Sequence, residues 1–137
     1  MKKLIRYVFA LLTLVVIAFN LKAQAPKQTN NKPTVATIEV IQFHSEHRCV
    51  TCLKIEKLTR ATLAKYFSAI PFKLVNVEEK KNEKIAEQFQ ATGTALFLYN
   101  PTTGKKKDLT DFAFMKAGDE KGFEIALTKY IQDFLKL

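Results

Sequence analysis

Two cysteines separated by two residues, Cys49 and Cys52, are the only cysteines in this chain of 137 residues. They follow a run rich in β-branched residues, 35–43, and they open a stretch in which apolar residues recur at three- and four-residue steps. The first pattern predicts a strand and the second an amphipathic helix, so both cysteines are expected in the first turn of a helix. This placement is typical of a redox site, and it makes thiol–disulfide chemistry the first hypothesis.

The expected position gives the two cysteines different roles. Free N–H groups and the positive end of the helix dipole stabilise a thiolate there, and Arg48 adds positive charge. Such surroundings lower a cysteine pKa from about 8.5 toward about 3.5–7.5, which makes the thiolate nucleophilic at neutral pH. We predict that Cys49 attacks a partner sulfur and that Cys52, one turn further along, resolves the mixed disulfide. Arg48 and Thr51 are expected to tune the site.

The first 23 residues have the layout of a secretory signal peptide. A basic start, 1–6, precedes an uncharged apolar stretch of 13 residues, 7–19, and a polar exit with small residues follows. A transmembrane helix needs about 20 apolar residues, so we expect cleavage after Ala23 and a periplasmic or otherwise exported protein. An uncleaved segment would anchor the protein to the membrane. Disulfides persist outside the cytoplasm, which agrees with a redox role for the cysteines.

The rest of the chain is expected to be a flexible linker, 24–34, and a single domain, 35–137. The linker contains two prolines and almost no apolar side chains. The signal segment carries four basic residues and no acid, so its removal lowers the net charge from +9 to +5. The remaining lysines alternate with acids, as on a solvated surface, and we expect no nucleic-acid partner.

Apolar periodicity predicts seven elements in the domain: strand, helix, strand, helix, strand, strand and helix. After the first strand and helix, we expect a strand at 72–77, a short helix after Asn82, a strand at 94–99, a strand within 106–115 and a final helix from about Asp119. The turn-forming residues 101–104 join the last two strands as an antiparallel hairpin.

This order, with a cysteine pair at the first strand-to-helix junction, resembles the thioredoxin-like fold. The resemblance covers 35–137 and implies an α/β domain with a central mixed four-stranded sheet (βαβαββα) flanked by three helices. The stretch 44–56 also resembles the Arg-Cys-x-Thr-Cys-x-x-Ile-Glu pattern of small exported bacterial proteins of the nitrophenyl compound nitroreductase subunit ArsF family. That family name implies a subunit of a reducing system.

Three departures from thioredoxins bear on the expected chemistry. Val50-Thr51 stands between the cysteines in place of a pair with proline or glycine, which leaves the redox direction open. Thioredoxins carry a buried acid that helps to deprotonate the resolving thiol, and Gln42 or Phe43 stands at its place here. Thioredoxin-like sites also set a cis-proline against the cysteine pair. Thr94 or Ala95 stands at that place, and we expect these two residues to tune the site.

Two other functions for the cysteines compete with redox exchange. With His44 and His47, they bring two imidazoles and two thiolates within nine residues, a set that suits copper(I) or zinc. The alternative prediction is therefore an extracytoplasmic copper-binding or carrier protein that uses Cys49, Cys52, His44 and His47. A static structural disulfide is the third possibility, but so small a loop contributes little entropic stabilisation.

The export signal, the helix-terminal cysteines and the element order together favour a thiol–disulfide oxidoreductase. Its expected partner is an extracytoplasmic protein thiol or disulfide, and it could serve as an electron-transfer subunit of a reductase system. The sequence contains no flavin- or nicotinamide-binding pattern, so we expect no cofactor besides the redox-active disulfide. Any nitroreduction would then be the work of a partner.

Overall fold

The computed structural model describes residues 38–136. The expected signal peptide, 1–23, and linker, 24–34, lie outside the described residues. The described elements are, in chain order, β1 (Glu39–His44), α2 (Val50–Tyr66), β2 (Phe72–Asn76), the short 3-10 helix η2 (Lys80–Asn82), α3 (Glu83–Phe89), β3 (Ala95–Tyr99), β4 (Lys106–Asp108), α4 (Thr110–Lys116) and α5 (Glu120–Leu135).

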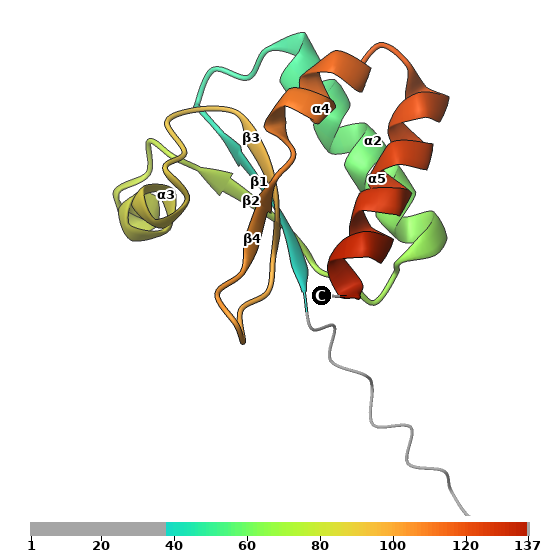
Figure 1. Ribbon diagram of the computed structural model, residues 1–137. Helices are drawn as coiled ribbons and strands as arrows, with labels where there is room; N and C mark the ends of the chain where they lie inside the picture. The colour runs from blue at the N-terminus through green and yellow to red at the C-terminus, as the bar shows by residue number, and fades with distance from the viewer. Residues whose placement is uncertain (1–37, 137) are drawn as a thin grey trace, which may run out of the picture. The chain divides into compact units, whose positions relative to one another are not determined.

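The four strands form one mixed sheet in the order β2-β1-β3-β4. β1 runs parallel to β2 and antiparallel to β3, and β3 runs antiparallel to β4. Helix α3 covers one face of the sheet, and α2, α4 and α5 cover the other (Figure 1). The predicted α/β fold of the thioredoxin-like type, with its mixed four-stranded sheet, is confirmed.

Two apolar cores lie on opposite faces of the sheet because successive side chains of a strand point to opposite sides. Val40 of β1 belongs to the larger core, which it shares with α2, α4 and α5. Ile41 and Phe43 belong to the smaller core under α3. With both faces covered, β1 is buried on both sides, including the polar residues Glu39 and Gln42.

The strand predicted within residues 106–115 is β4, which is shorter than that range, but the helix that follows it was not predicted. β4 ends at Asp108, and the following residues form α4, so four α-helices flank the sheet where three were expected. Asp108 Oδ1 accepts a hydrogen bond from Thr110 N at 2.8 Å, which turns the chain at the end of the strand. Leu109, Phe112 and Ala113 are buried at helical spacing, and this packing selects a helix over a longer strand.

The loop 91–94 connects α3 to β3 and passes next to the cysteine pair. Gln90, in the left-handed conformation with φ 54°, ends α3. Residues 91–94 form the connection that follows. That connection brings Thr94 to the N-terminal end of α2, where it contacts Cys52.

We expect Phe43→Ala to destabilise the protein by about 3–5 kcal/mol in urea unfolding. Phe43 is fully buried, and its ring centroid lies 5.3 Å from that of Phe89 and 5.9 Å from that of Phe97. Phe114→Ala is the matched control, because Phe114 is 42% exposed, and its loss should be about 0.5 kcal/mol. Equal losses for the two variants would contradict the assignment of Phe43 to a packed core.

Candidate functional site

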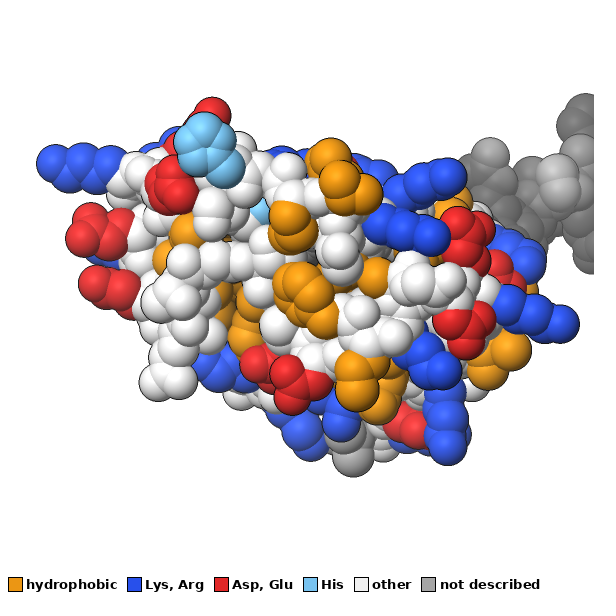
Figure 2. Space-filling model, turned by 90° about the horizontal axis from the view of Figure 1, so that it is seen from above, with side chains coloured by type: hydrophobic (Ala, Val, Ile, Leu, Met, Phe, Trp, Pro, Cys, Tyr) orange, Lys and Arg blue, Asp and Glu red, His pale blue; other side chains and the backbone are white. Residues whose placement is uncertain are grey.

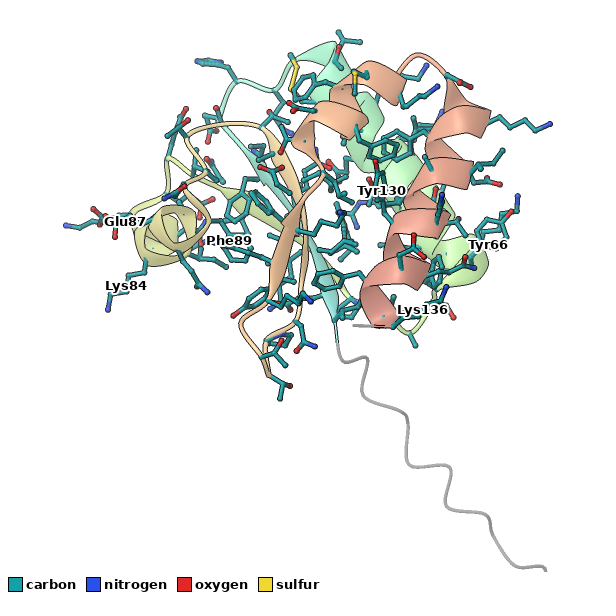
Figure 3. The ribbon with its side chains drawn as sticks, viewed as in Figure 1. Tyr66, Lys84, Glu87, Phe89, Tyr130 and Lys136 are labelled. Carbon is teal, nitrogen blue, oxygen red and sulfur yellow. A yellow bond between two sulfur atoms is a disulfide. The ribbon has the colours of Figure 1, made fainter. Side chains whose placement is uncertain are left out.

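Cys49 and Cys52 form a disulfide at the N-terminal end of α2 (Figure 3). The sulfur atoms are 2.07 Å apart and the Cα atoms 5.1 Å apart. Cys49 is exposed, whereas Cys52 is only 5% exposed. Cys49 is therefore accessible from solvent, while Cys52 faces the interior.

Helix α2 begins directly after Cys49, which is its N-cap residue. The Cys49 sulfur accepts a hydrogen bond from the backbone N–H of Cys52 at 3.1 Å. Among the described residues of the first turn of α2, none is acidic. The helix end therefore presents donors and positive potential to the Cys49 sulfur, and in the reduced protein these favour its thiolate.

Thr94 binds the buried sulfur. Its hydroxyl Oγ1 donates a hydrogen bond to Cys52 Sγ at 3.1 Å. Ala95 is the first residue of β3, pairs with Phe43 in the sheet and is half-buried. Of the two residues expected beside the cysteine pair, Thr94 is thus the one for which the structure shows a hydrogen bond to sulfur.

Gln42 also contacts Cys52, through the backbone carbonyl of Cys52. It is fully buried on β1, and its Nε2 donates a hydrogen bond to the Cys52 carbonyl at 3.0 Å. Phe43 faces the other core, so Gln42 stands at the place where a thioredoxin has its buried acid. An amide has no ionisable proton at neutral pH, so Gln42 cannot deprotonate the Cys52 thiol.

Arg48, expected to tune the site, is held by a carboxylate. Its Nη1 lies 2.6 Å from Oε2 of Glu56, and Glu56 Oε1 also accepts from Arg60 Nε at 2.8 Å. Burial alone would raise the pKa of Glu56, but the hydrogen bonds and charges of Arg60 and Arg48 outweigh it and hold that pKa below its usual value. Part of the Arg48 charge is therefore compensated before it can act on a sulfur.

The remaining predicted residues are placed as follows. Thr51 is half-buried in the first turn of α2. His44 ends β1, and its Nδ1 donates to the Ser45 carbonyl at 2.8 Å, while His47 is exposed in the loop. Within residues 38–136, no three His, Cys, Asp or Glu side chains come together in a way that could hold a metal ion. The structure thus does not gather the alternative metal ligands into one site.

Exposed apolar side chains mark the same end of the molecule. Figure 2 looks onto this end and shows apolar side chains across the middle of the face, with charged side chains toward its margins. Val50 and Leu53 on α2 and Phe114 and Met115 on α4 are exposed, Val50 by 83% and Met115 by 76%. The sequence reasoning missed the last two because it did not predict α4. Their position between the buried Ala113 and Ala117 of a helical pattern was the available signal.

A hollow of about 560 Å³ adjoins the site. It lies between the loop that contains Thr94, strand β4 and the start of α4. Its lining includes the polar side chains of Lys106, Asp108, Thr110 and Asp111. No sequence pattern pointed to this hollow, because it depends on how the α3–β3 loop and β4 meet in space.

Comparisons with known proteins give little further information. No family model and no curated protein matches this chain. A solved structure described as "Structure of a malarial protein" is 22% identical, covers 58% of this chain and 94% of its own, and has a TM-score of 0.41. A likeness at this level says nothing about function.

Thr94→Val is expected to slow closure of the disulfide by about tenfold. In the reduced protein the hydroxyl can stabilise the Cys52 thiolate that must attack Cys49, and a hydrogen bond to a charged group contributes about 1.5–3 kcal/mol. Closure can be followed by mass spectrometry after a glutathione mixed disulfide is formed on Cys49. Thr110→Val is the matched control, since Thr110 lines the same hollow but its hydroxyl accepts from Leu96 N. Equal rates in the two variants would rule out this role for Thr94.

Glu56→Gln should lower the free energy of unfolding by about 1–3 kcal/mol at neutral pH, because two arginines lose their carboxylate. The pKa of Glu56 is lowered in the folded protein, so its stabilisation is present above the unfolded-state pKa, about 4.3, and is lost as pH falls through the folded-state pKa. The variant and the wild type should therefore converge in acid. Glu87 is exposed on α3 (Figure 3) and serves as the control. The free energy of unfolding of Glu87→Gln should match that of the wild type within about 0.5 kcal/mol at neutral and at acid pH. A pH-independent difference for Glu56→Gln would contradict the ionic origin.

Proposed function

We propose that this protein is a thiol–disulfide oxidoreductase that acts through Cys49 and Cys52. The observation that carries the proposal is the disulfide with one exposed sulfur at the N-cap of α2 and one buried sulfur beneath it. Exposed disulfides tend to be the reactive ones, and a helix N-terminus stabilises the thiolate that such chemistry needs. A loop with two intervening residues also contributes little as a structural cross-link.

In the reduced state, the Cys49 thiolate attacks one sulfur of a partner disulfide. A bond forms between Cys49 and that sulfur, the partner S–S bond breaks, and the other partner sulfur leaves as a thiolate. Cys52 then gives up its proton to the partner thiolate released in the first step, and the Cys52 thiolate attacks the Cys49 sulfur. The Cys49–Cys52 bond forms, and the second partner thiolate leaves. Two electrons pass to the partner, whose thiolates take up protons, and a partner dithiol drives the same steps in reverse.

The surroundings of the disulfide support a protein as the partner. The exposed side chains of Val50, Leu53, Phe114 and Met115 offer apolar surface on α2 and α4, which contact each other. Apolar side chains gathered on an exposed face are typical of protein-interaction sites. The partner class that we propose is an extracytoplasmic protein thiol or disulfide.

The proposal also includes where the protein acts and the system to which it belongs. The layout of residues 1–23 supports export to the periplasm or beyond, where the disulfide could persist. Among the described residues, no helix is long and apolar enough to cross a membrane. The resemblance of residues 44–56 to the ArsF family supports a role as an electron-transfer subunit of a reductase system.

Cys52→Ser should trap a stable mixed disulfide with a disulfide-bonded model peptide, because the resolving sulfur is gone. Cys49→Ser should trap none, since Cys52 is buried. His44→Ala and His47→Ala should exchange like the wild type. Non-reducing electrophoresis and mass spectrometry of the reduced proteins after incubation with the peptide measure all four variants.

The reduction potential of the wild-type pair decides between the remaining functions. A value of about −120 to −270 mV against glutathione supports exchange, and one below about −300 mV indicates a structural bridge. Copper binding that disappears in both His44→Ala and His47→Ala would instead favour the metal carrier. Trapping through Cys52 rather than Cys49 would overturn the assignment of the two roles.

A further inference from the structure

Gln42 carries a buried polar atom whose hydrogen-bonding capacity is unused. The side chain is fully buried, and its Nε2 is satisfied by the Cys52 carbonyl. Its Oε1 finds no hydrogen-bond partner among residues 38–136. A buried acceptor without a donor is destabilising, and folded proteins retain few of them. This one belongs to the amide group that contacts the buried cysteine of the site.

Reduction of the disulfide creates a new donor at that cysteine. In the disulfide, neither sulfur carries a proton. When an external dithiol reduces the disulfide, the Cys49–Cys52 bond breaks and the two external sulfurs join in a disulfide. The two protons of the external thiols pass to Cys49 and Cys52, so Cys52 Sγ becomes an S–H group. An S–H group is a hydrogen-bond donor, although a weak one. Cys52 is only 5% exposed, so water has little access to it, and an acceptor must come from the protein.

We infer that Gln42 is a positioning residue for the exchange reaction, whose Oε1 accepts a hydrogen bond from the Cys52 thiol in the reduced protein. The inference rests on the proposed function. The bond from Nε2 to the Cys52 carbonyl holds the amide against this residue and leaves Oε1 as its free acceptor. The Thr94 hydroxyl can remain a donor to the same sulfur, so the thiol would have both a donor and an acceptor.

This hydrogen bond would stabilise the reduced state relative to the oxidised state. The reduced state gains a hydrogen bond that the oxidised state lacks, while the oxidised state keeps an unpaired acceptor. Gln42 therefore favours the dithiol and makes the disulfide more oxidising. It also holds the Cys52 proton until attack, which prolongs the mixed disulfide with a partner.

Thr59, on the same helix as Cys52, supplies a matched control. Its side chain is fully buried, and its Oγ1 also lacks a hydrogen-bond partner within the described part of the chain. It lies about two helical turns beyond Cys52. Thr59→Val removes an unpaired oxygen of the same kind, at nearly constant volume, where no sulfur is involved.

The first experiment compares reduction potentials by equilibration with glutathione. Gln42→Met removes the acceptor at similar volume and should favour the disulfide about tenfold, which is a shift of about 30 mV toward more negative values. Thr59→Val should leave the potential at the wild-type value, with any effect confined to the unfolding midpoint. A Gln42→Met potential equal to that of the wild type overturns the inference.

The second measurement observes the contact itself. In a Cys49→Ser background Cys52 carries the sole thiol, and its infrared S–H stretch should lie at lower wavenumber than that of a free thiol. Adding Gln42→Met should move this band to higher wavenumber, and adding Thr59→Val should not. A band that is insensitive to Gln42→Met overturns the inference.

A third measurement needs no substitution, and it applies even where Gln42→Met fails to fold. The side-chain carbonyl carbon of Gln42 should move downfield in the nuclear magnetic resonance spectrum when the wild type is reduced, whereas that of the exposed Gln132 should stay. An unchanged Gln42 resonance overturns the inference. Failure of the wild type to exchange with glutathione would instead overturn the proposed function, and the infrared band would still report the Gln42 contact.

Discussion

The burial of β1 is the constraint on which the site depends. This strand is hydrogen-bonded to β2 on one edge and to β3 on the other, and helices cover both of its faces. The register of this strand is therefore fixed, because a shift of one residue would move each of its side chains to the opposite core. The end of β1 fixes where the loop to α2 starts, and the register of β3 fixes where Thr94 meets the sulfur.

Neutral groups contact the buried cysteine of this site. The Cys52 sulfur accepts from the Thr94 hydroxyl, the Cys52 carbonyl accepts from the Gln42 amide, and the guanidinium of Arg48 is paired with Glu56. The exposed Cys49 sulfur depends instead on the backbone N–H groups at the start of α2. The two sulfurs of one disulfide thus lie in different electrostatic surroundings, which is what a reaction with distinct attacking and resolving steps requires.

Local sequence patterns predicted β1, α2 and the position of the cysteines between them, because β-branched residues are concentrated in the strand and a long amphipathic helix repeats its apolar period several times. They did not predict α4, where a three-residue strand passes directly into a seven-residue helix and neither is long enough to show its period. The choice between Gln42 and Phe43 depended on which face of β1 each residue occupies, and only the packing of α2 and α3 decides that. Export and partner remain predictions, since the residues that bear on export lie outside 38–136.

Different side chains of α4 pack in the core and face solvent. Phe112 and Ala113 attach it to the core, while Phe114 and Met115 stay exposed at the end of the molecule that carries the disulfide. Evolution can therefore alter the exposed pair without loosening the scaffold, and can alter the scaffold without changing what the helix presents. A lineage that duplicates such a gene could diversify this surface while the disulfide and its helix are inherited intact.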